Sequence, residues 1–384
     1  MANDGLQHTA TDLEERGGLA LPPAAELRGR FCIQPHPNPT PETEWKQVMS
    51  ELKFGTRFSD HMAVATWTSG TGWHDRQVRP FGPIELSPAA AVLHYGQEVF
   101  EGLKAYRHAD GSVWTFRPAF NAARFNASAR RMGLPELPVE DFVGSIVSVV
   151  QADERFVPRD PGTSLYLRPF MFASEPFLGV RPAREITYMM IASPVGPYFA
   201  NGLAPVSIWV TRKYHRAGPG GTGAAKTGGN YASSLLPQEV AAERGFDQVC
   251  FLDAATNSNL EELGGMNVFI VRSDGRVQTP RLTGTILEGG TRSAIIRMLR
   301  DHGTPVTEET IAIDRLIADI ATGDVVEMFA CGTAAVVTPI GHLASDDFDV
   351  KLPQTEFTQT VYDRLVSIQN GLAPDPYGWT YRIV

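Results

Sequence analysis

The sequence predicts an α/β protein of the α+β kind that folds as two domains. The first observation is that stretches alternating apolar and polar residues, as half-buried strands do, are interspersed with stretches whose apolar residues recur at helical spacing. The second is that this mixed pattern is interrupted by PVGPYFANGLAP at residues 194–205 and then starts again. With 384 residues, 43% of them hydrophobic, the chain is long enough for two substantial cores.

The predicted domain boundaries follow changes in composition. The N-terminal residues are rich in proline and polar side chains, which predicts an extension that is partly disordered. The stretch rich in proline and glycine predicts an interdomain linker. We therefore expect an N-terminal extension over residues 1–40, a small N-terminal α/β domain over 41–194, a linker over 195–205 and a large C-terminal domain over 206–384.

The N-terminal domain is expected to begin with a long β-hairpin, because residues 54–88 alternate apolar and polar side chains around a Ser-Gly-Thr-Gly turn. Apolar residues at helical spacing then predict two helices, and apolar stretches bounded by turns predict strands. The expected elements are a strand over 113–117, helices over 119–132 and 139–154, and strands over 164–173 and 186–193.

The C-terminal domain is expected to begin with a buried strand over residues 206–212 that leads into a glycine-rich loop. A helix follows Tyr231 and runs to about residue 244, with a kink at Pro237. The other expected elements are a strand over 248–252, a hairpin over 267–279 that turns at Asp274-Gly275, a helix from Thr291, and two strands within 325–340 broken at Cys331-Gly332-Thr333.

Composition and charge argue against several classes of function. The net charge of −9 disfavours nucleic acid and anionic membranes as partners, because both need a basic surface. Three widely spaced cysteines do not make a disulfide framework, and the first residues show no secretory signal. The nine histidines have no metal-binding spacing, so no metal site is expected, and His94 is interpreted as a packed core residue. A cytoplasmic enzyme of small metabolites fits these observations.

The most informative stretch is GPGGTGAAKTGGNYASS at residues 218–234, in which Lys226 stands in a glycine-rich loop. Glycine lets a backbone turn sharply and pass close to a ligand. An amine held in an apolar pocket loses part of its proton affinity, and a neutral amine can form a Schiff base with an aldehyde such as pyridoxal phosphate. Two alternatives stay open from this stretch alone. One is a solvated surface lysine, and the other is a phosphate-binding P-loop, which needs glycine where Ala225 stands.

Other residues of the C-terminal domain could complete a cofactor site. Gly290 and Thr291 open a helix, whose free N–H groups and dipole favour an anion, although many helices begin after glycine. Thr333 and Ala334 offer a hydroxyl and free amides in a tight turn, which is also a common plain connection between strands. The hydroxyl of Tyr231, five residues after the lysine, could bind a cofactor ring oxygen.

Charged residues at strand and helix ends add to these candidates. Glu262 precedes a glycine pair and could hold a pyridine nitrogen protonated, or be a surface charge, whereas Glu261 points the other way on an extended chain and is interpreted as solvated. Tyr166 and Arg168 lie two apart on a strand, hence on one face, and an arginine there suits a carboxylate ligand or a structural salt bridge. Arg117 and Arg124 lie on either side of a predicted helix start.

Taken together, these motifs resemble the fold-type IV pyridoxal-phosphate enzymes. The matching stretches are Lys226 with GGNY, ExGxMN from Glu262, GGTR at 289–292 and GTA at 332–334. Within those enzymes the chain resembles the branched-chain amino acid aminotransferases. That likeness covers roughly residues 43–384 and rests on HYGQEVFEGLKAYR at 94–107, RPxxNxxR at 117–124, YLRP at 166–169 and SEPFLGV at 174–180.

The resemblance implies a smaller α+β domain, a larger domain with a pseudo-barrel sheet, and an active site at the domain interface. It implies that Lys226 is the Schiff-base lysine and the proton shuttle of pyridoxal 5'-phosphate. The implied cofactor-binding residues are Arg124, Lys226, Tyr231, Glu262, Gly290, Thr291 and Thr333. The implied substrate-binding residues are Tyr95, Phe100, Tyr166, Arg168, Tyr198, Thr333, Ala334, Leu178 and Val180.

The reaction that the resemblance implies is a ping-pong transfer of the amino group between L-leucine, L-isoleucine or L-valine and 2-oxoglutarate, giving branched-chain 2-oxo acids and L-glutamate. It also implies a homodimer, in which Leu178 and Val180 help complete the partner's active site. D-amino acid aminotransferases and aminodeoxychorismate lyase share the lysine and the glutamate and are the nearest alternatives. A P-loop nucleotide-binding protein is a more distant one.

The sequence departs from the family pattern in two respects. Many relatives have a hydroxyl residue where this chain has Gly265, so a hydrogen bond near the cofactor is expected to be missing or replaced by water. The mammalian enzymes carry a redox Cys-x-x-Cys where this chain has Ala335 and Thr338. Cys331 lies before the turn and is expected to be a small buried residue, so no thiol switch is predicted.

Overall fold

The computed structural model describes residue 13 and residues 17–197 and 203–384. Its contacts divide the chain into two compact units. Four residues that include Lys226, Ala225–Gly228, belong to the N-terminal unit. The chain directly before and after them belongs to the C-terminal unit. The N-terminal unit contains Thr11–Ala200, Ala225–Gly228 and Ser367–Val384, and the C-terminal unit contains Asn201–Ala224 and Gly229–Val366. The domain boundaries and the linker at 195–205 stay predictions.

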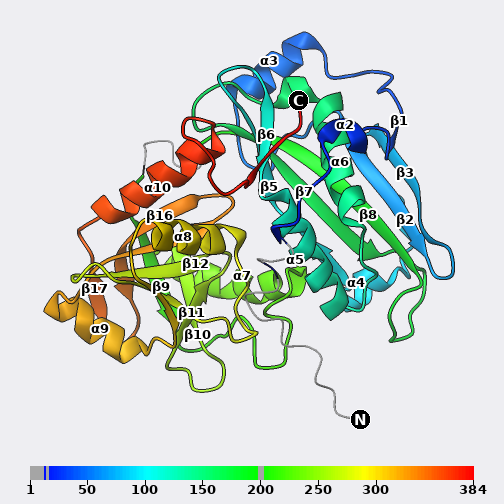
Figure 1. The fold of residues 1–384 in the computed structure, drawn as a ribbon. Coiled ribbons are helices and arrows are strands. Elements are labelled where there is room, and N and C mark those ends of the chain that lie inside the picture. The colour runs from blue at the N-terminus through cyan, green and yellow to red at the C-terminus, as the bar shows by residue number, and fades with distance from the viewer. Residues whose placement is uncertain (1–12, 14–16, 198–202) are drawn as a thin grey trace. The chain divides into compact units, whose positions relative to one another are not determined.

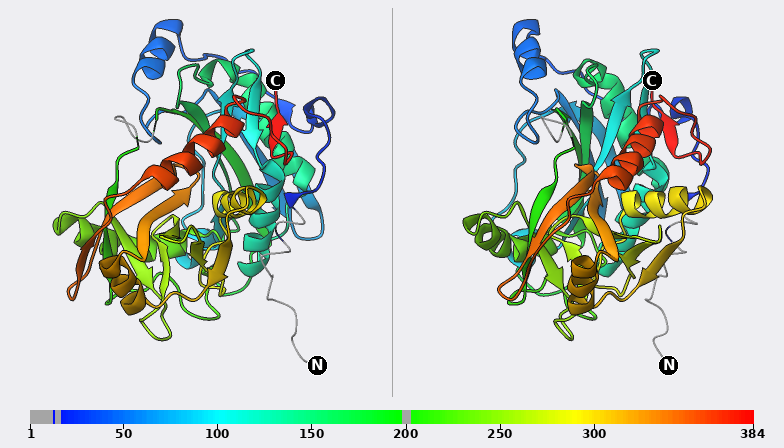
Figure 2. Two further views of the ribbon diagram at one scale, coloured as in Figure 1. Left: turned by 60° about the vertical axis from the view of Figure 1, so that its left-hand side comes forward. Right: turned by 90° about the vertical axis from the view of Figure 1, so that its left-hand side faces the viewer.

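The N-terminal unit is built on a sheet of nine strands, in which every described pair except β1 with β3 is antiparallel (Figures 1 and 2). The strand order is β1 (Cys32–Ile33), β3 (Gly72–Pro80), β2 (His61–Thr68), β8 (Glu185–Val195), β7 (Ser164–Ala173), β5 (Leu103–Arg107), β6 (Val113–Phe116) and β18 (Thr380–Arg382), with β4 (Glu98–Phe100) also paired to β7. The helices are α2 (Ala24–Leu27), α3 (Glu42–Ser50), α4 (Ala91–Tyr95), α5 (Pro118–Arg131) and α6 (Val139–Ala152), and a 3-10 turn follows at Glu154–Phe156.

The alternation of side chains along β7 separates a core face from a second face. Leu165 and Leu167 are fully buried in the main hydrophobic core of the unit, which α5 and α6 cover from one side (Figure 1). Tyr166 and Arg168 alternate with them, are only half-buried and lie on the other face. The periodicity of one strand therefore keeps the predicted substrate-binding residues out of the core.

The C-terminal unit also contains a nine-stranded sheet, and this one mixes parallel and antiparallel pairs. Contacts of β11 with β12 and β13, far along the strand order, show that the sheet curls into a half-barrel. The order is β11 (Leu260–Leu263), β10 (Gln248–Leu252), β9 (Val206–Thr211), β16 (Val336–Ala344), β15 (Val325–Gly332), β12 (Asn267–Arg272), β13 (Val277–Pro280) and β14 (Val306–Glu309), with β17 (Asp349–Lys351) paired to β16. The helices are α7 (Gly228–Glu243), α8 (Gly290–Asp301), α9 (Ile313–Thr322) and α10 (Glu356–Gln369).

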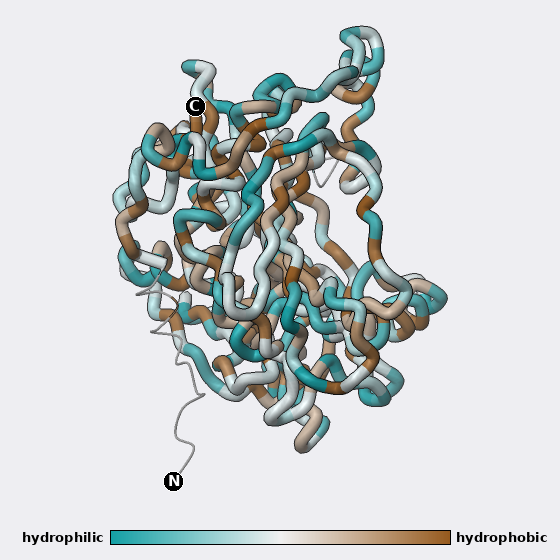
Figure 3. Tube along the Cα trace, turned by 90° about the vertical axis from the view of Figure 1, so that its right-hand side faces the viewer, coloured by the Kyte–Doolittle hydropathy of each residue, from teal (hydrophilic) through white to brown (hydrophobic). Residues whose placement is uncertain are grey.

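The structure confirms the elements that the sequence predicts, including the long hairpin of β2 and β3. Most of β3 is hydrophilic and half-buried, in keeping with its place near a sheet edge (Figure 3). Leu27 and Phe31 are buried in the core of the N-terminal unit, so part of the N-terminal extension is built into the fold. No helix in the described ranges has the length and apolar character that a membrane span requires.

Candidate active site

Lys226 is held by its backbone against β4 and α5 of the N-terminal unit. Its carbonyl oxygen accepts a hydrogen bond of 3.0 Å from the Phe100 amide. Its own amide donates one of 2.9 Å to the Ser128 hydroxyl. The lysine Nζ lies 4.7 Å from the centroid of the Phe100 ring, a cation–π distance. The side chain that the glycine-rich loop was predicted to display is thus oriented by an aromatic ring.

Glycines on both sides of Lys226 permit close backbone approaches. A Cβ atom at Gly223 would overlap the backbone of Thr285 within the C-terminal unit. A Cβ atom at Gly228 would lie 2.6 Å from the Glu98 carboxylate within the N-terminal unit. At Gly223 a larger residue would force backbone to move, so close packing explains the glycine there, whereas at Gly228 it would displace the Glu98 side chain.

Arg168 and Tyr166 form the second group of predicted residues in this unit. The Arg168 Nη2 atom donates a hydrogen bond of 3.0 Å to the Tyr166 hydroxyl, and its Cζ lies 4.8 Å from the Phe100 ring centroid. Among the described residues, no carboxylate forms a salt bridge with Arg168, and its buried Nε has no hydrogen-bond partner. The structural salt bridge considered from the sequence is therefore not formed among the described residues.

Lys104 shares this face and was missed by the sequence analysis. It lies on β5 directly opposite Tyr166 on β7, and residues paired across two strands point to the same face of a sheet. Burial lowers the pKa of its ammonium group to about 8. The signal available in the sequence was the GLKAYR motif, which was used only for the family resemblance.

Tyr95, Leu178 and Val180 lie at the surface of the N-terminal unit. Tyr95 is 43% exposed at the end of α4, and its hydroxyl donates a hydrogen bond to the Leu178 carbonyl. Leu178 and Val180 are 60% and 86% exposed. The prediction that His94 is a core residue is wrong: it is exposed on the short helix α4 and contacts the Pro88 carbonyl at 2.9 Å. Tyr198 lies outside the described residues.

Arg124 is buried and paired with a carboxylate that the sequence analysis did not single out. Its Nε and Nη2 atoms donate hydrogen bonds of 2.7 and 2.8 Å to the two oxygens of Glu101. Glu101 also accepts a bond of 2.8 Å from Asn121. A bidentate pair of this kind fixes the plane of the guanidinium group, so the orientation of Arg124 is set before any ligand arrives.

In the C-terminal unit, Glu262 is a buried carboxylate with well-defined partners. Arg216 approaches it at 2.9 Å, and both side chains are almost wholly buried. The Leu287 amide and the Asn267 side chain donate bonds of 2.8 and 3.1 Å to its two oxygens. A cation and hydrogen-bond donors around a buried carboxylate favour its ionised form. Arg216 was missed because it lies in the loop between β9 and α7, far from Glu262 in the sequence.

The interpretation of Glu261 as a solvated residue is wrong. All four residues of β11 are buried, so both faces of this strand are covered. Glu261 accepts a hydrogen bond from the Thr285 hydroxyl, and its Oε2 atom has no partner among the described residues. Burial raises its pKa, and the bond from Thr285 and the charge of Arg216 only partly oppose this.

The remaining predicted residues of this unit lie on α7, α8 and one turn. A Cβ atom at Gly265 would lie 3.7 Å from the Tyr231 ring, so these two positions are neighbours. Gly290 and Thr291 open α8 behind Gly289, where any Cβ atom would overlap Asn267, the same residue that binds Glu262. The final predicted residues, Thr333 and Ala334, occupy the turn between β15 and β16.

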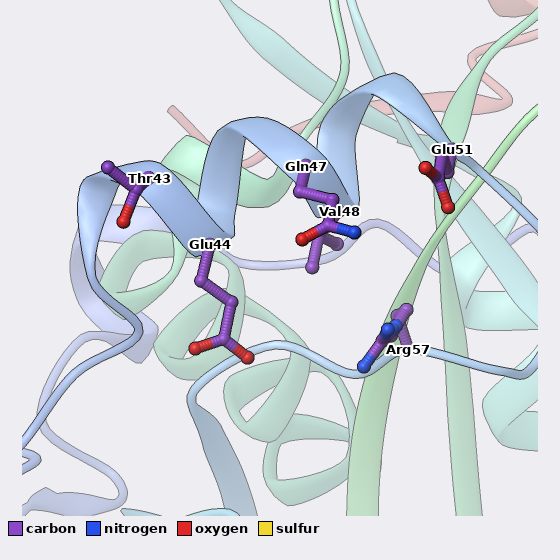
Figure 4. A pocket seen from close by; sticks show the side chains of 6 residues that line it. All are labelled: Thr43, Glu44, Gln47, Val48, Glu51 and Arg57. Atoms are coloured by element: carbon purple, nitrogen blue, oxygen red, sulfur yellow. The ribbon is translucent and has the colours of Figure 1, made fainter.

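Two cavities lie apart from most of these residues. One, of about 370 Å³, lies beside α3, where Glu44 and Gln47 extend from the helix and Arg57 from the chain nearby (Figure 4). None of the predicted site residues lines it. The other, of about 260 Å³ in the C-terminal unit, is lined by Glu261 and Thr285 but not by Glu262. No group of metal-ligating side chains occurs in the part of the chain that the structure describes.

Comparison with known proteins decides the family. The family model described as Amino-transferase class IV matches residues 98–343. The chain belongs to the class IV aminotransferases. A family member from Streptomyces coelicolor, named probable branched-chain-amino-acid aminotransferase, is 50% identical over 91% of this chain and 98% of its own length. The P-loop alternative is therefore not favoured.

Solved structures of class IV aminotransferases agree with this assignment. A branched-chain aminotransferase from Thermoproteus uzoniensis, determined with norvaline, superposes with a TM-score of 0.70 at 27% identity and covers 84% of this chain and all of its own. The branched-chain amino acid aminotransferase of Escherichia coli gives a TM-score of 0.70 at 26% identity, covering 84% of this chain and all of its own. The fold-type IV architecture expected from the sequence is confirmed.

Proposed function

We propose that the protein transfers the amino group reversibly between L-leucine, L-isoleucine or L-valine and 2-oxoglutarate, with pyridoxal 5'-phosphate as its cofactor. The observation that carries the proposal is Lys226, anchored by its backbone and oriented by the Phe100 ring, in a chain that is 50% identical to a relative of this name over nearly its full length. The alternatives of the same fold, D-amino acid aminotransferase and aminodeoxychorismate lyase, are not favoured by that likeness.

The residues present fit this cofactor. Glu262 is a buried carboxylate that faces the Arg216 cation, which suits a partner for a protonated ring nitrogen. The N-terminus of α8 at Gly290 and Thr291 suits a phosphate, because the first amides of a helix lack acceptors of their own. We assign the ring oxygen to Tyr231 and further phosphate contacts to Arg124 and Thr333.

Pyridoxal phosphate supplies an aldehyde that carries the amino group and a ring that accepts electrons. Lys226 would hold the cofactor through its amine, and the same amine would serve as the base that moves the proton at the substrate Cα. Glu262 would hold the proton of the ring nitrogen, and the bonds from Leu287 and Asn267 to Glu262 fix the orientation of its carboxylate. The hydrogen bonds described above already fix the Lys226 backbone and the Glu262 carboxylate in the protein alone.

The substrate-binding residues are proposed to serve two kinds of side chain. The rings of Phe100 and Tyr166 are assigned to the side chain of leucine, isoleucine or valine. Tyr95 and Tyr198 are assigned to the same pocket from the family resemblance alone. Arg168, which stands over the Phe100 and Tyr166 rings, provides a cation for the second carboxylate of glutamate or 2-oxoglutarate. The amides of Thr333 and Ala334 are assigned to the substrate α-carboxylate.

A cytoplasmic homodimer is part of the proposal. Leu178 and Val180 are strongly exposed, and Phe177 is 38% exposed beside them. A group of exposed apolar residues on one loop is typical of a contact surface. A second copy of this chain would cover them, and the hydrogen bond from Tyr95 to the Leu178 carbonyl would link that contact to a predicted substrate-binding residue.

A substrate panel tests the function. With 2-oxoglutarate as acceptor, L-leucine, L-isoleucine and L-valine should each react far faster than L-aspartate, L-lysine or any D-amino acid. For L-lysine the reason is that burying its ammonium group without a partner costs roughly 2 kcal/mol or more, which is at least tenfold in rate. Faster transfer from D-alanine than from L-leucine would move the protein to the D-amino acid aminotransferases.

A further inference from the structure

The backbone on both sides of Lys226 is held by side chains that the proposed reaction does not use. On the N-terminal side, the Lys226 amide donates to the Ser128 hydroxyl at 2.9 Å. On the C-terminal side, the Gly228 amide and the Thr227 hydroxyl both donate to one oxygen of Glu98, the latter at 3.1 Å. Glu98 lies 130 positions from Gly228 in the sequence, so the fold alone brings this pair together.

The Gly228 amide needs an acceptor from outside its own helix. Gly228 is the first residue of α7, and the first amides of an α-helix have no carbonyl within the helix to bind. Glu98 supplies the acceptor. Its oxygen is close enough that a Cβ atom on residue 228 would lie 2.6 Å from it, so the absence of a side chain at Gly228 is what allows the bond.

Strand β4 therefore holds the lysine segment at two points. Glu98 and Phe100 lie two apart on β4 and point to the same face. Phe100 binds the Lys226 carbonyl through its amide and carries the lysine Nζ over its ring, while Glu98 holds the next two residues. Burial raises the pKa of Glu98, and the bonds from Gly228 and Thr227, together with the weaker influence of the Arg168 charge, oppose that shift.

We propose that Glu98 is a positioning residue for Lys226: by binding the Gly228 amide and the Thr227 hydroxyl it fixes where the lysine amine stands over Phe100. The inference rests on the proposed role of Lys226 as the residue that holds the cofactor and moves the proton. Because a small misplacement of a reacting group lowers the rate of the chemical step more than it weakens substrate binding, loss of Glu98 should lower kcat and leave KM nearly unchanged.

The test compares Glu98→Ala, which removes the acceptor, with Glu98→Gln, which keeps an oxygen in the same place. Glu154→Ala is the matched control, because Glu154 is another partly exposed carboxylate of the same unit and binds Arg107 instead. The first measurement is amide hydrogen exchange of residues 226–228 in the protein freed of cofactor. The second is the leucine half-reaction and its steady-state constants in the cofactor-loaded enzyme.

Glu98→Ala should speed exchange of the Gly228 amide at least about tenfold, and lower kcat about tenfold to a hundredfold, with KM for leucine within about twofold of the parent value. Glu98→Gln should keep the Gly228 exchange rate and kcat close to the parent values. Glu154→Ala should change neither the exchange rate nor kcat. If Glu98→Ala fails to fold, Gly228→Ala is the second variant, since its methyl group displaces the Glu98 oxygen and should produce the same two effects.

Three results would overturn the proposal. One is normal exchange of the Gly228 amide in Glu98→Ala or Gly228→Ala. The second is a Glu98→Gln variant as slow as Glu98→Ala, because a required negative charge would mean direct action on substrate or cofactor. The third is an effect on KM alone. Failure of the proposed function would look different from failure of this proposal. The parent protein would then not transfer the amino group of leucine, but Glu98→Ala would still speed exchange of the Gly228 amide in the cofactor-free protein.

Discussion

Arg216→Met tests whether the buried ion pair with Glu262 keeps that carboxylate charged. The two side chains are 2% and 4% exposed and approach at 2.9 Å. Removing one partner of such a pair leaves a buried charge and costs about 3–5 kcal/mol. Arg216 also donates bonds of 3.1 and 2.9 Å to the carbonyls of Gly223 and Thr285, whose loss costs about 1 kcal/mol each.

A double-mutant cycle separates the charge from the carbonyl bonds. When Glu262→Gln is already present, Arg216→Met no longer leaves a buried negative charge without a partner, so its cost should fall to that of the lost hydrogen bonds, about 2–3 kcal/mol. Urea unfolding of the four proteins without cofactor, followed by circular dichroism, measures this difference. Arg212→Met, which breaks pairs with the exposed carboxylates of Asp347 and Asp314, is the control and should cost less than about 1 kcal/mol. Equal costs of Arg216→Met in the two backgrounds would refute the reasoning.

Three further predictions concern the chemistry, a buried acid and the assembly. Glu262→Gln should leave cofactor binding largely intact and slow the leucine half-reaction by about two to three orders of magnitude in stopped-flow measurements, because only charge that develops during the reaction is affected; unchanged turnover would mean that the wrong acid was assigned. Glu261 has a raised pKa caused by burial, so its neutral form stabilises the fold at low pH and that contribution is lost as pH rises through the raised value. Glu261→Gln should accordingly increase the free energy of unfolding at pH 7 by about 1–3 kcal/mol and change it little below about pH 4. If the substitution changed the free energy of unfolding at neither pH, Glu261 would be solvated in the folded protein and the reasoning would be wrong. Leu178→Asp should weaken the proposed dimer in sedimentation, or raise KM for leucine more than for glutamate, and a fully active monomeric parent protein would rule the shared site out.

Local periodicity explains why so many elements could be predicted from the sequence. The strand at β7 and the hairpin of β2 and β3 are set by alternation and turn residues that lie within a few positions of one another. Helix α9 was overlooked, although its amphipathic run ends at Gly323 in the left-handed conformation typical of a helix end. Its signal was present in the sequence and was not used.

The contacts that hold the candidate site could not be predicted because they join distant parts of the chain. Lys226 and Glu262 were found through motifs, but nothing local links Glu98 to Gly228, Arg216 to Glu262 or Glu101 to Arg124. The error on Glu261 has the same origin. Alternation indicates that Glu261 and Glu262 face opposite ways, but only the fold shows that both faces of β11 are covered.

The central claim is that Lys226 holds pyridoxal phosphate, and covalent trapping tests it most directly. The purified protein should be yellow, lose that colour on treatment with sodium borohydride, and yield on peptide mass mapping a phosphopyridoxyl mass on Lys226, with Lys104 and Lys213 unmodified. A Lys226→Ala variant should show no modified peptide. A protein that gains the mass on another lysine, or gains none while transferring amino groups normally, would contradict the account.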